Sequence, residues 1–325
     1  MRRRGLGATL AGWGRELTIL AVLAALSVYL GVTQPNFINS FTIASILTDA
    51  AYVGVVGVGM TAVIVGGQID ISVGSMLGVC ALISAMLARA GTPMPLVVAA
   101  SLALGLAMGS LNGALVAYLR IPAIIVTLAT LTMLRGGILW WTQGYWVMPL
   151  PDAWKFLGTT PLLGLPLPIW IGWVTVGLAA YLLANTTFGR QVYAVGSNPR
   201  AALLAGINVP RTTFLLFALN GLLVGLAAMI DVTRFSQVET EEGLGLEFLV
   251  ITAVVVGGTN IFGGSGRVIG TYLGVLLIIV TSSALTFLGI SATWDQAIRG
   301  AFILLAVTAD IVRTGQWRRV VGWAR

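Results

Sequence analysis

The sequence of 325 residues is 58% hydrophobic and only 9% charged, and its mean hydropathy is +0.97. Soluble domains carry roughly 25% charged residues, so this composition excludes an ordinary soluble protein and predicts an integral membrane protein. The chain has no histidine and a single cysteine, Cys80. It therefore lacks the groups for a Ser-His-Asp triad, for histidine acid–base catalysis and for an intrachain disulfide, and we predict no catalytic residue and no metal site.

Apolar stretches long enough to cross about 30 Å of hydrocarbon recur along the whole chain. They predict an all-α polytopic membrane protein with about ten transmembrane helices and no separate soluble domain. The expected spans are 17–33, 42–66, 72–89, 96–118, 122–141, 167–185, 212–231, 244–259, 268–288 and 294–312. The chain then divides into an N-terminal tail at 1–16, a single transmembrane domain at 17–312 and a C-terminal tail at 313–325.

Basic residues predict the orientation of these spans. With the N-terminus in the cytoplasm, most arginines fall in the tails and the inner connections, whereas Arg89, Lys155 and Arg234 fall outside. Both termini are therefore expected to be cytoplasmic. The net charge of +7 is explained by this asymmetry, so no nucleic-acid partner is needed.

Two polar interruptions, "VIVGGQIDISVGS" at 63–75 and "VVVGGTNIFGGSG" at 254–266, predict broken or re-entrant helix ends near 66–75 and 257–267. Gly66 and Gly67 give the backbone freedom for a helix reversal at the cytoplasmic edge. Asp70 and Ser72 are expected to cap the next helix, whose first turn includes Gly74 and Ser75. Direct contact of Asp70 with a solute is the alternative.

Small residues four apart predict closely packed helix pairs. They occur at Gly74 and Gly78, at Gly105, Gly109 and Gly113, at Gly221 and Gly225, and at Gly270 and Gly274. The sequence also echoes itself weakly: the two interrupted stretches resemble each other, and "LNGALV" at 111–116 resembles "LNGLLV" at 219–224. Internal duplication and chance similarity of apolar sequence both remain open.

Polar residues within the spans are the candidates for a translocation pathway, although each could instead bind a neighbouring helix. They are Asn112, Thr127, Thr130, Thr132, Arg135 and Asn220. Ionisable groups deep in the spans are few, because Asp49 and Asp231 lie near outer ends and only Arg135 and Arg299 lie well inside. So few ionisable groups within the spans argue against proton-coupled transport. No "GK" dipeptide exists to complete a phosphate-binding P-loop, so an uncharged solute and an energy source on another subunit fit better.

The longest polar segment assigned to the inside is "FGRQVYAVGSNPRAALLAGINVPRT" at 188–212. Within it Asn198 is expected to cap a short helix that begins at Pro199 and ends at Gly206. Such a helix is either a docking element or a plain connector.

Four of these stretches carry a resemblance to a known family. "GGQIDISVGS", "GALVAYLRIPAIIVTLATLTMLRG", "FGRQVYAVGSNPRAALLAGINV" and "VVVGGTNIFGGSGRVIGT" together resemble the permease subunits of bacterial ABC importers for monosaccharides, the ribose-type class. The similarity runs from about residue 35 to 312. "PMPLVVAASLALGL" and "SATWDQAIRGAFILLAVTAD" look closest to the autoinducer-2 and rhamnose branch.

The resemblance implies a transport subunit of the bacterial inner membrane that is not itself an enzyme. Two permease chains, identical or paralogous, would form the pathway within the lipid bilayer. A periplasmic binding protein would deliver a neutral monosaccharide or an autoinducer-2-like sugar derivative, and cytoplasmic ATPase subunits would hold the ATP and Mg, leaving no cofactor on this chain. The outer loops around Glu239 to Glu247 and from Gly144 to Leu165 would face the binding protein, or are ordinary solvated loops.

The same resemblance implies that the loop at about 186–211 couples the permease to the ATPase. Its coupling helix would comprise Asn198, Pro199, Arg200, Ala201, Ala202, Gly206, Ile207 and Asn208. Two other functions remain open: a related ABC permease for branched amino acids or nucleosides, and an ion-coupled secondary carrier.

Overall fold

The computed structural model describes residues 14–291 and, beyond them, only positions 294, 297, 298, 300, 301, 304 and 308. The helices are α2 (Gly14–Thr33), α3 (Ser40–Val65), α4 (Val73–Arg89), α5 (Met94–Ala117), α6 (Ala123–Thr142), η1 (Asp152–Lys155), α7 (Phe156–Thr159), α8 (Leu167–Asn185), α9 (Thr187–Ser197), α10 (Pro199–Leu204), α11 (Val209–Val232), α12 (Leu246–Val256) and α13 (Val268–Phe287). A short antiparallel hairpin joins β1 (Pro161–Leu162) to β2 (Leu165–Pro166).

Among the described residues, seven helices are long and apolar enough to cross a membrane: α2, α3, α5, α6, α8, α11 and α13. This confirms an all-α polytopic membrane fold. Each expected span from 17–33 to 268–288 corresponds to one helix, but α4 has only 17 residues and α12 only 11. The expected tenth span at 294–312, with Arg299, lies outside the continuously described part of the chain.

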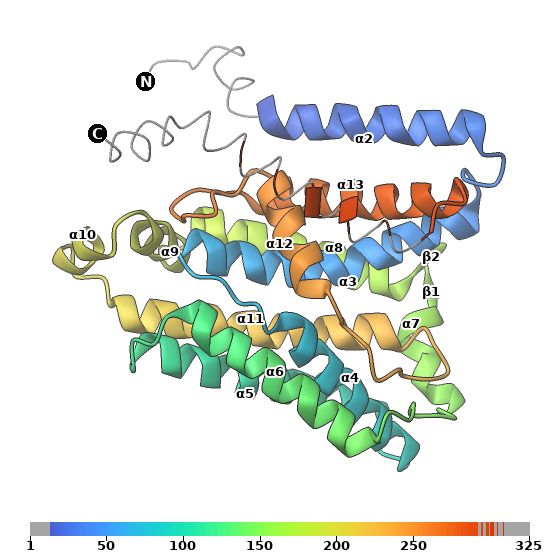
Figure 1. The fold of residues 1–325 in the computed structure, drawn as a ribbon, viewed down its shortest axis with the longest axis horizontal. Helices are drawn as coiled ribbons and strands as arrows, with labels where there is room; N and C mark the ends of the chain where they lie inside the picture. The colour runs from blue at the N-terminus through green and yellow to red at the C-terminus, as the bar shows by residue number, and fades with distance from the viewer. Residues whose placement is uncertain are drawn as a thin grey trace.

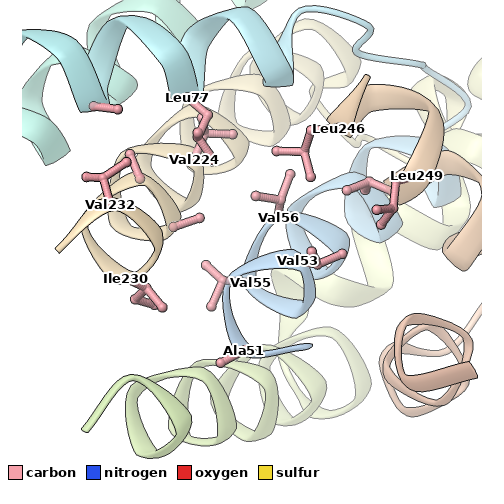
Figure 2. Close-up of a cluster of buried hydrophobic side chains, with 14 of the residues drawn as sticks. Ala51, Val53, Val55, Val56, Leu77, Val224, Ile230, Val232, Leu246 and Leu249 are labelled. Carbon is pink, nitrogen blue, oxygen red and sulfur yellow. The ribbon is translucent and has the colours of Figure 1, made fainter. Parts of the chain in front are cut away.

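The centre of the bundle is built on α11 and α3, whose surfaces, like that of α13, are mostly buried, whereas α2, α5, α6 and α8 remain largely exposed. Apolar side chains of α3, α4, α11 and α12 meet in one cluster, where Val56, Leu77, Val224 and Leu246 lie close together (Figure 2). The core therefore forms where the two short helices pass the two central long ones.

Helices α5 and α11 approach each other through glycines. A Cβ atom on Gly109 would collide with the carbonyl oxygen of Phe217 and would lie 2.9 Å from the Cα of Gly221. A Cβ on Gly105 would likewise collide with the carbonyl oxygen of Gly221. The expected close packing of these small residues is confirmed for this pair, because only hydrogen at these positions lets the two backbones come so near.

The chain re-enters the bundle after α3. Helix α3 ends at Val65, Gly66 closes it, and Gly67 takes a φ of +80° that favours glycine. The chain then runs back between the helices before α4 begins inside the bundle at Val73, as the blue connection in Figure 1 shows. The helix therefore breaks at the two glycines, and the chain after them does not stay at the edge.

A second connection, residues 233–245, enters the bundle from the opposite side. It leads from the end of α11 to the start of α12, and there a Cβ on Gly74 would collide with the carbonyl oxygen of Gly243 and with the Glu247 carboxylate. The two short helices therefore begin beside each other in the interior and run toward opposite ends of the molecule (Figure 1). We call the end that carries α9 and α10 the α10 end.

The two interrupted stretches that echo each other in sequence meet at the α10 end. The N–H of Gly264 donates to the carbonyl oxygen of Val65 at 2.8 Å. A Cβ on Gly263 would lie 2.9 Å from the Cα of Gly67. The broken helix ends near 66–75 and 257–267 are thus packed on one another.

The connection between α6 and α8 is more ordered than its sequence indicated. It contains η1, α7 and the hairpin, and Trp154 is fully buried with its indole N–H donating to the carbonyl oxygen of Val232 at 3.1 Å. This segment therefore packs on the end of α11 and does not form a free loop.

Candidate functional site

Asp70 lies fully buried in the interior of the bundle. Its Oδ1 accepts hydrogen bonds from the N–H of Ser72 at 3.0 Å and from the Ser72 hydroxyl at 2.6 Å. Its Oδ2 accepts a hydrogen bond from the side-chain amide of Asn220, in the middle of α11, at 3.0 Å. The expectation of a position at the edge of the membrane domain is therefore wrong for Asp70, because the chain after Gly67 turns back between the helices.

The expected capping role is wrong for Ser72. This residue stands at the N-cap position of α4, but its side chain makes no capping hydrogen bond. The buried carboxylate of Asp70 is the stronger acceptor and takes the hydroxyl hydrogen instead. Asp70 itself binds the N–H two residues ahead, as in an Asx turn, and not one in the first helical turn. Ser75 is buried within that turn.

The hydrogen bonds continue from Ser72 to two further helices. The amide of Asn112 in α5 donates to the Ser72 hydroxyl at 2.9 Å, and the Thr130 hydroxyl of α6 donates to the Asn112 side-chain oxygen at 2.6 Å. We call the set Thr130, Asn112, Ser72, Asp70 and Asn220 the midbundle network. It joins α6, α5, the re-entrant segment and α11, and it unites residues that the sequence predicted for two separate roles.

One atom of the midbundle network is unsatisfied. The side-chain nitrogen of Asn220 faces Asp70, so the side-chain oxygen of Asn220 points away from it. This buried Asn220 Oδ1 has no hydrogen-bond partner among the described residues. It packs against Gly59, beside a small apolar cavity of about 160 Å³ between α3, α8 and α11. An unpaired buried acceptor costs about 1–3 kcal/mol, so this position favours a molecule that can donate a hydrogen bond.

Three predicted pathway residues lie outside the midbundle network. Thr132 is exposed, and its hydroxyl donates only to carbonyl oxygens of its own helix. Thr127 is buried, but its hydroxyl donates to the carbonyl oxygen of Ala123 in its own helix at 2.9 Å. The half-buried guanidinium of Arg135 donates to the carbonyl oxygens of Thr240 at 3.3 Å and Glu242 at 3.1 Å. Arg135 therefore fastens α6 to the re-entrant connection 233–245.

An ion cluster that the sequence did not predict lies at the end opposite α10. Arg234 binds Asp49 of α3 at 2.7 Å and Asp231 of α11 at 2.6 Å. Glu242 and Tyr52 lie beside Asp231 around a polar cavity of about 280 Å³. Burial, together with the neighbouring Asp231 carboxylate, raises the pKa of Glu242 to about 8. The available signal was that the expected topology already placed both aspartates and Arg234 at one end.

The segment at 198–208 forms a compact projection at the α10 end. The Asn198 side chain accepts the N–H of Ala201 at 3.1 Å and caps α10 as expected. After α10, Gly206 has a φ of +83°, and the N–H of Ile207 donates to the carbonyl oxygen of Ala202 at 3.0 Å. These bonds close both ends of a very short helix, which is what makes it a defined element.

The surface of this projection carries both charged and apolar side chains. Pro199, Arg200 and Ala201 are exposed, whereas Ala202 is buried. Two leucines complete the projection, and their exposed fractions are 62% for Leu203 and 90% for Leu204. The Asn208 side chain accepts the N–H of Arg211 at 3.0 Å and begins α11. An apolar tip on a capped helix offers a surface that another protein can bind.

The chain is similar in sequence to known permease proteins. A family model described as the permease component of the branched-chain amino acid transport system matches residues 42–307. The autoinducer 2 import system permease protein LsrC of Shigella flexneri is 37% identical over 296 residues, which cover 91% of this chain and 86% of that protein. The LsrC protein of Salmonella typhi is 37% identical over 299 residues, covering 91% of this chain and 85% of that protein. No solved structure matches the chain.

Proposed function

The chain belongs to the permease family whose model spans residues 42–307, and from this we propose that it is the membrane-spanning subunit of an ATP-driven importer for a small neutral solute. Its relatives, at 37% identity over 91% of the chain, are named for autoinducer 2 import. This likeness supports a monosaccharide or a sugar derivative of the autoinducer-2 type as the solute.

Family membership carries the importer proposal, and the structural observation that supports a hydroxylated solute is the midbundle network. It offers amides, hydroxyls and one carboxylate, the groups that hydrogen-bond a hydroxylated solute. Within the described part of the chain, no cationic side chain bonds to it. The network runs from the buried Asp70 to Thr130, which is only half-buried on the exposed helix α6. A second permease chain, identical or paralogous, would cover this face of α6 and enclose the pathway.

The topology proposed with this function places the α10 end in the cytoplasm, with ten spans and both termini inside, in a bacterial inner membrane. Basic residues concentrate on that side, as the positive-inside rule requires. The connections 144–166 and 233–245 would then face a periplasmic binding protein.

Energy would come from cytoplasmic ATPase subunits, which would hold the ATP and Mg. The chain has no P-loop of its own. The capped helix α10, with Leu204 exposed at 90%, is the proposed coupling helix. The exposed leucines would sit in an apolar groove on the ATPase, and Arg200 would lie at its rim.

Two alternatives are separated by specific observations. The family description names branched-chain amino acids, but a zwitterionic amino acid calls for a cation that the midbundle network lacks. An ion-coupled carrier gains one argument, since a buried carboxylate at Asp70 is what proton coupling uses. The sequence pattern itself predicts no acidic residue in the interior of the spans. Membership of the permease family supports the importer over the carrier.

A panel of labelled solutes tests the assignment in cells that lack native uptake systems and express the chain with its partner subunits. Autoinducer 2, rhamnose, ribose and leucine should be offered in turn. We expect uptake of a sugar-type solute, dependent on all subunits and indifferent to a proton uncoupler while ATP is maintained. Uptake of leucine alone would overturn the sugar assignment, and uptake by this chain alone would make it a secondary carrier.

Cysteine labelling tests the pathway. In a Cys80→Ser background, Thr130→Cys should react with a membrane-impermeant maleimide and be protected by the transported solute. Thr132→Cys is the matched control, because Thr132 is exposed on the same helix but bonds only its own helix. Equal reactivity of the two positions, or no protection by solute, would contradict a pathway at the midbundle network.

A further inference from the structure

An exposed aromatic side chain lies at the α10 end, on the connection 257–267 between α12 and α13. Within the part of the chain that the structure describes, Phe262 is 60% exposed, although the next residue, Gly263, is buried. The connection reaches the same end of the molecule as α9 and α10 (Figure 1). Neither the midbundle network nor the proposed coupling helix uses this phenyl ring.

The loop that carries Phe262 is closed by hydrogen bonds. The N–H of Asn260 donates to the carbonyl oxygen of Ser265 at 2.9 Å, and the N–H of Gly263 donates to the carbonyl oxygen of Asn260 at 3.0 Å. The side-chain oxygen of Asn260 accepts the N–H of Phe262 itself at 3.0 Å. The backbone is therefore fixed on both sides of the ring. A side chain with two rotatable bonds on a fixed backbone loses little conformational entropy when it binds a partner.

Two glycines fasten this loop to the base of α10. Gly263 and Gly264 have φ angles of +91° and +76°, which glycine adopts without strain. A Cβ on Gly264 would lie 2.9 Å from the Cα of Ser197, the last residue of α9. The next residue, Asn198, caps α10. Phe262 is therefore attached to the segment from which the proposed coupling helix begins.

This attachment limits the distance from Phe262 to the exposed leucines of α10. Phe262 is two Cα steps of about 3.8 Å from Gly264, and α10 is about 9 Å long at 1.5 Å per residue. With the short link through Ser197, these lengths keep Phe262 and Leu204 within roughly 30 Å of each other. An ordinary protein interface, with about 800 Å² on each partner, is about 30 Å across. One partner can therefore cover both side chains.

The residue type favours a protein partner over the membrane surface. Aromatic belts at membrane interfaces are built from tryptophan and tyrosine, whose rings carry a polar group for the headgroup region. Phenylalanine has no such group, and it is one of the residue types enriched in protein interfaces. At the end that the proposed topology places in the cytoplasm, the partner that the proposed function requires is the ATPase.

We infer that Phe262 is a second anchor for the ATPase subunit that binds α10, an inference that rests on the proposed function. The ring would fill an apolar pocket on the ATPase beside the groove that takes the exposed leucines of α10. The same loop holds the end of α3, because the N–H of Gly264 donates to the carbonyl oxygen of Val65 at 2.8 Å. Movement of the ATPase would therefore reach α3, from which the re-entrant segment leads to Asp70.

Surface plasmon resonance tests the inference, with the full-length chain in lipid nanodiscs and the purified ATPase subunit encoded next to it in solution. Phe262→Ala should weaken binding of the ATPase at least tenfold, the loss expected of one aromatic anchor at an interface. Ser265→Ala is the matched control, because Ser265 is exposed on the same loop, and it should bind as the wild type does. An unchanged melting temperature of Phe262→Ala separates a loss of binding from a loss of fold.

Leu204→Asp, measured in the same assay, distinguishes this inference from the proposed function. Wild-type affinity of Phe262→Ala together with weak binding of Leu204→Asp would overturn the second anchor and leave the coupling role of α10 standing. Wild-type affinity of both variants would overturn both.

Photochemical cross-linking identifies what covers the ring. Phe262→p-benzoylphenylalanine should cross-link to the ATPase on illumination of the assembled complex. Tyr181→p-benzoylphenylalanine is the control, since Tyr181 is 63% exposed on the membrane-spanning helix α8, and it should react with lipid. Cross-links from position 262 to lipid alone, or only within the chain itself, would overturn the inference.

Discussion

The hydrogen bond between Asn220 and Asp70 should be a measurable part of the stability of the membrane domain. Asn220→Ala removes the only donor to Asp70 Oδ2 that the described residues provide. A hydrogen bond to a charged group contributes about 1.5–3 kcal/mol, whereas interhelical hydrogen bonds in membranes average about 0.6 and reach about 1.7 kcal/mol. Because Asp70 is fully buried and has only neutral partners, we expect about 1.5 kcal/mol, roughly a tenfold change in the unfolding equilibrium.

A double-mutant cycle isolates this bond from the cavity that truncation leaves. The variants are Asn220→Ala, Asp70→Leu and both together, unfolded in mixed micelles of increasing dodecyl sulfate and followed by the fluorescence of the ten tryptophans. Thr127→Ala is the control, since its bond stays within one helix, and its coupling to Asn220 should be close to zero. A coupling free energy below about 0.5 kcal/mol between positions 70 and 220 would refute the reasoning, because that is the level at which independent sites add.

Three further predictions address packing, coupling and pH. Gly109→Leu should abolish the monodisperse peak in size-exclusion chromatography, because a side chain there meets the backbone of α11, whereas Gly136→Leu on α6, where nothing lies within 4 Å, should elute as the wild type does. Leu204→Asp should leave the melting temperature unchanged but reduce stimulation of the partner ATPase at least tenfold; full stimulation would contradict docking at α10. The pKa of Glu242 is about 8 in the folded protein, against an ordinary value of 4.5. Its contribution to the free energy of unfolding is therefore complete below pH 4.5 and is lost as the pH rises through about 8. Thermal melts at pH 6 and pH 9 should differ less in Glu242→Gln, and an unchanged difference would exclude this carboxyl as the cause.

The spans could be predicted because hydropathy is a local property of the chain. The boundaries expected for 167–185 and 268–288 agree with α8 (Leu167–Asn185) and α13 (Val268–Phe287) almost to the residue. Helix α9 was missed, since "TFGRQVYAVGS" is short and mixed in polarity. Its place depends on packing against the connection 257–267, which no local pattern reveals.

The candidate site was predicted in its members but not in its arrangement. Asn112 and Asn220 could be predicted as candidates because polar groups within membrane spans are costly unless they bind a partner or line a pathway. Nothing local indicated that Asp70 lies between them, since the distance a chain travels after a helix break is set by tertiary hydrogen bonds. Arg135 has backbone carbonyls as partners, and these leave no trace in the sequence.

The most direct test of the transport function is uptake into proteoliposomes that contain this chain, its partner ATPase and its binding protein, with ATP inside. We predict solute accumulation that needs every component and ATP, and that falls to background in Arg200→Glu and Gly206→Trp. The first changes the charge of an exposed side chain of the proposed coupling segment, and the second also strains the turn after α10, because Gly206 has a φ of +83°. Accumulation by this chain alone, without ATP and unaffected by these two substitutions, would contradict the account.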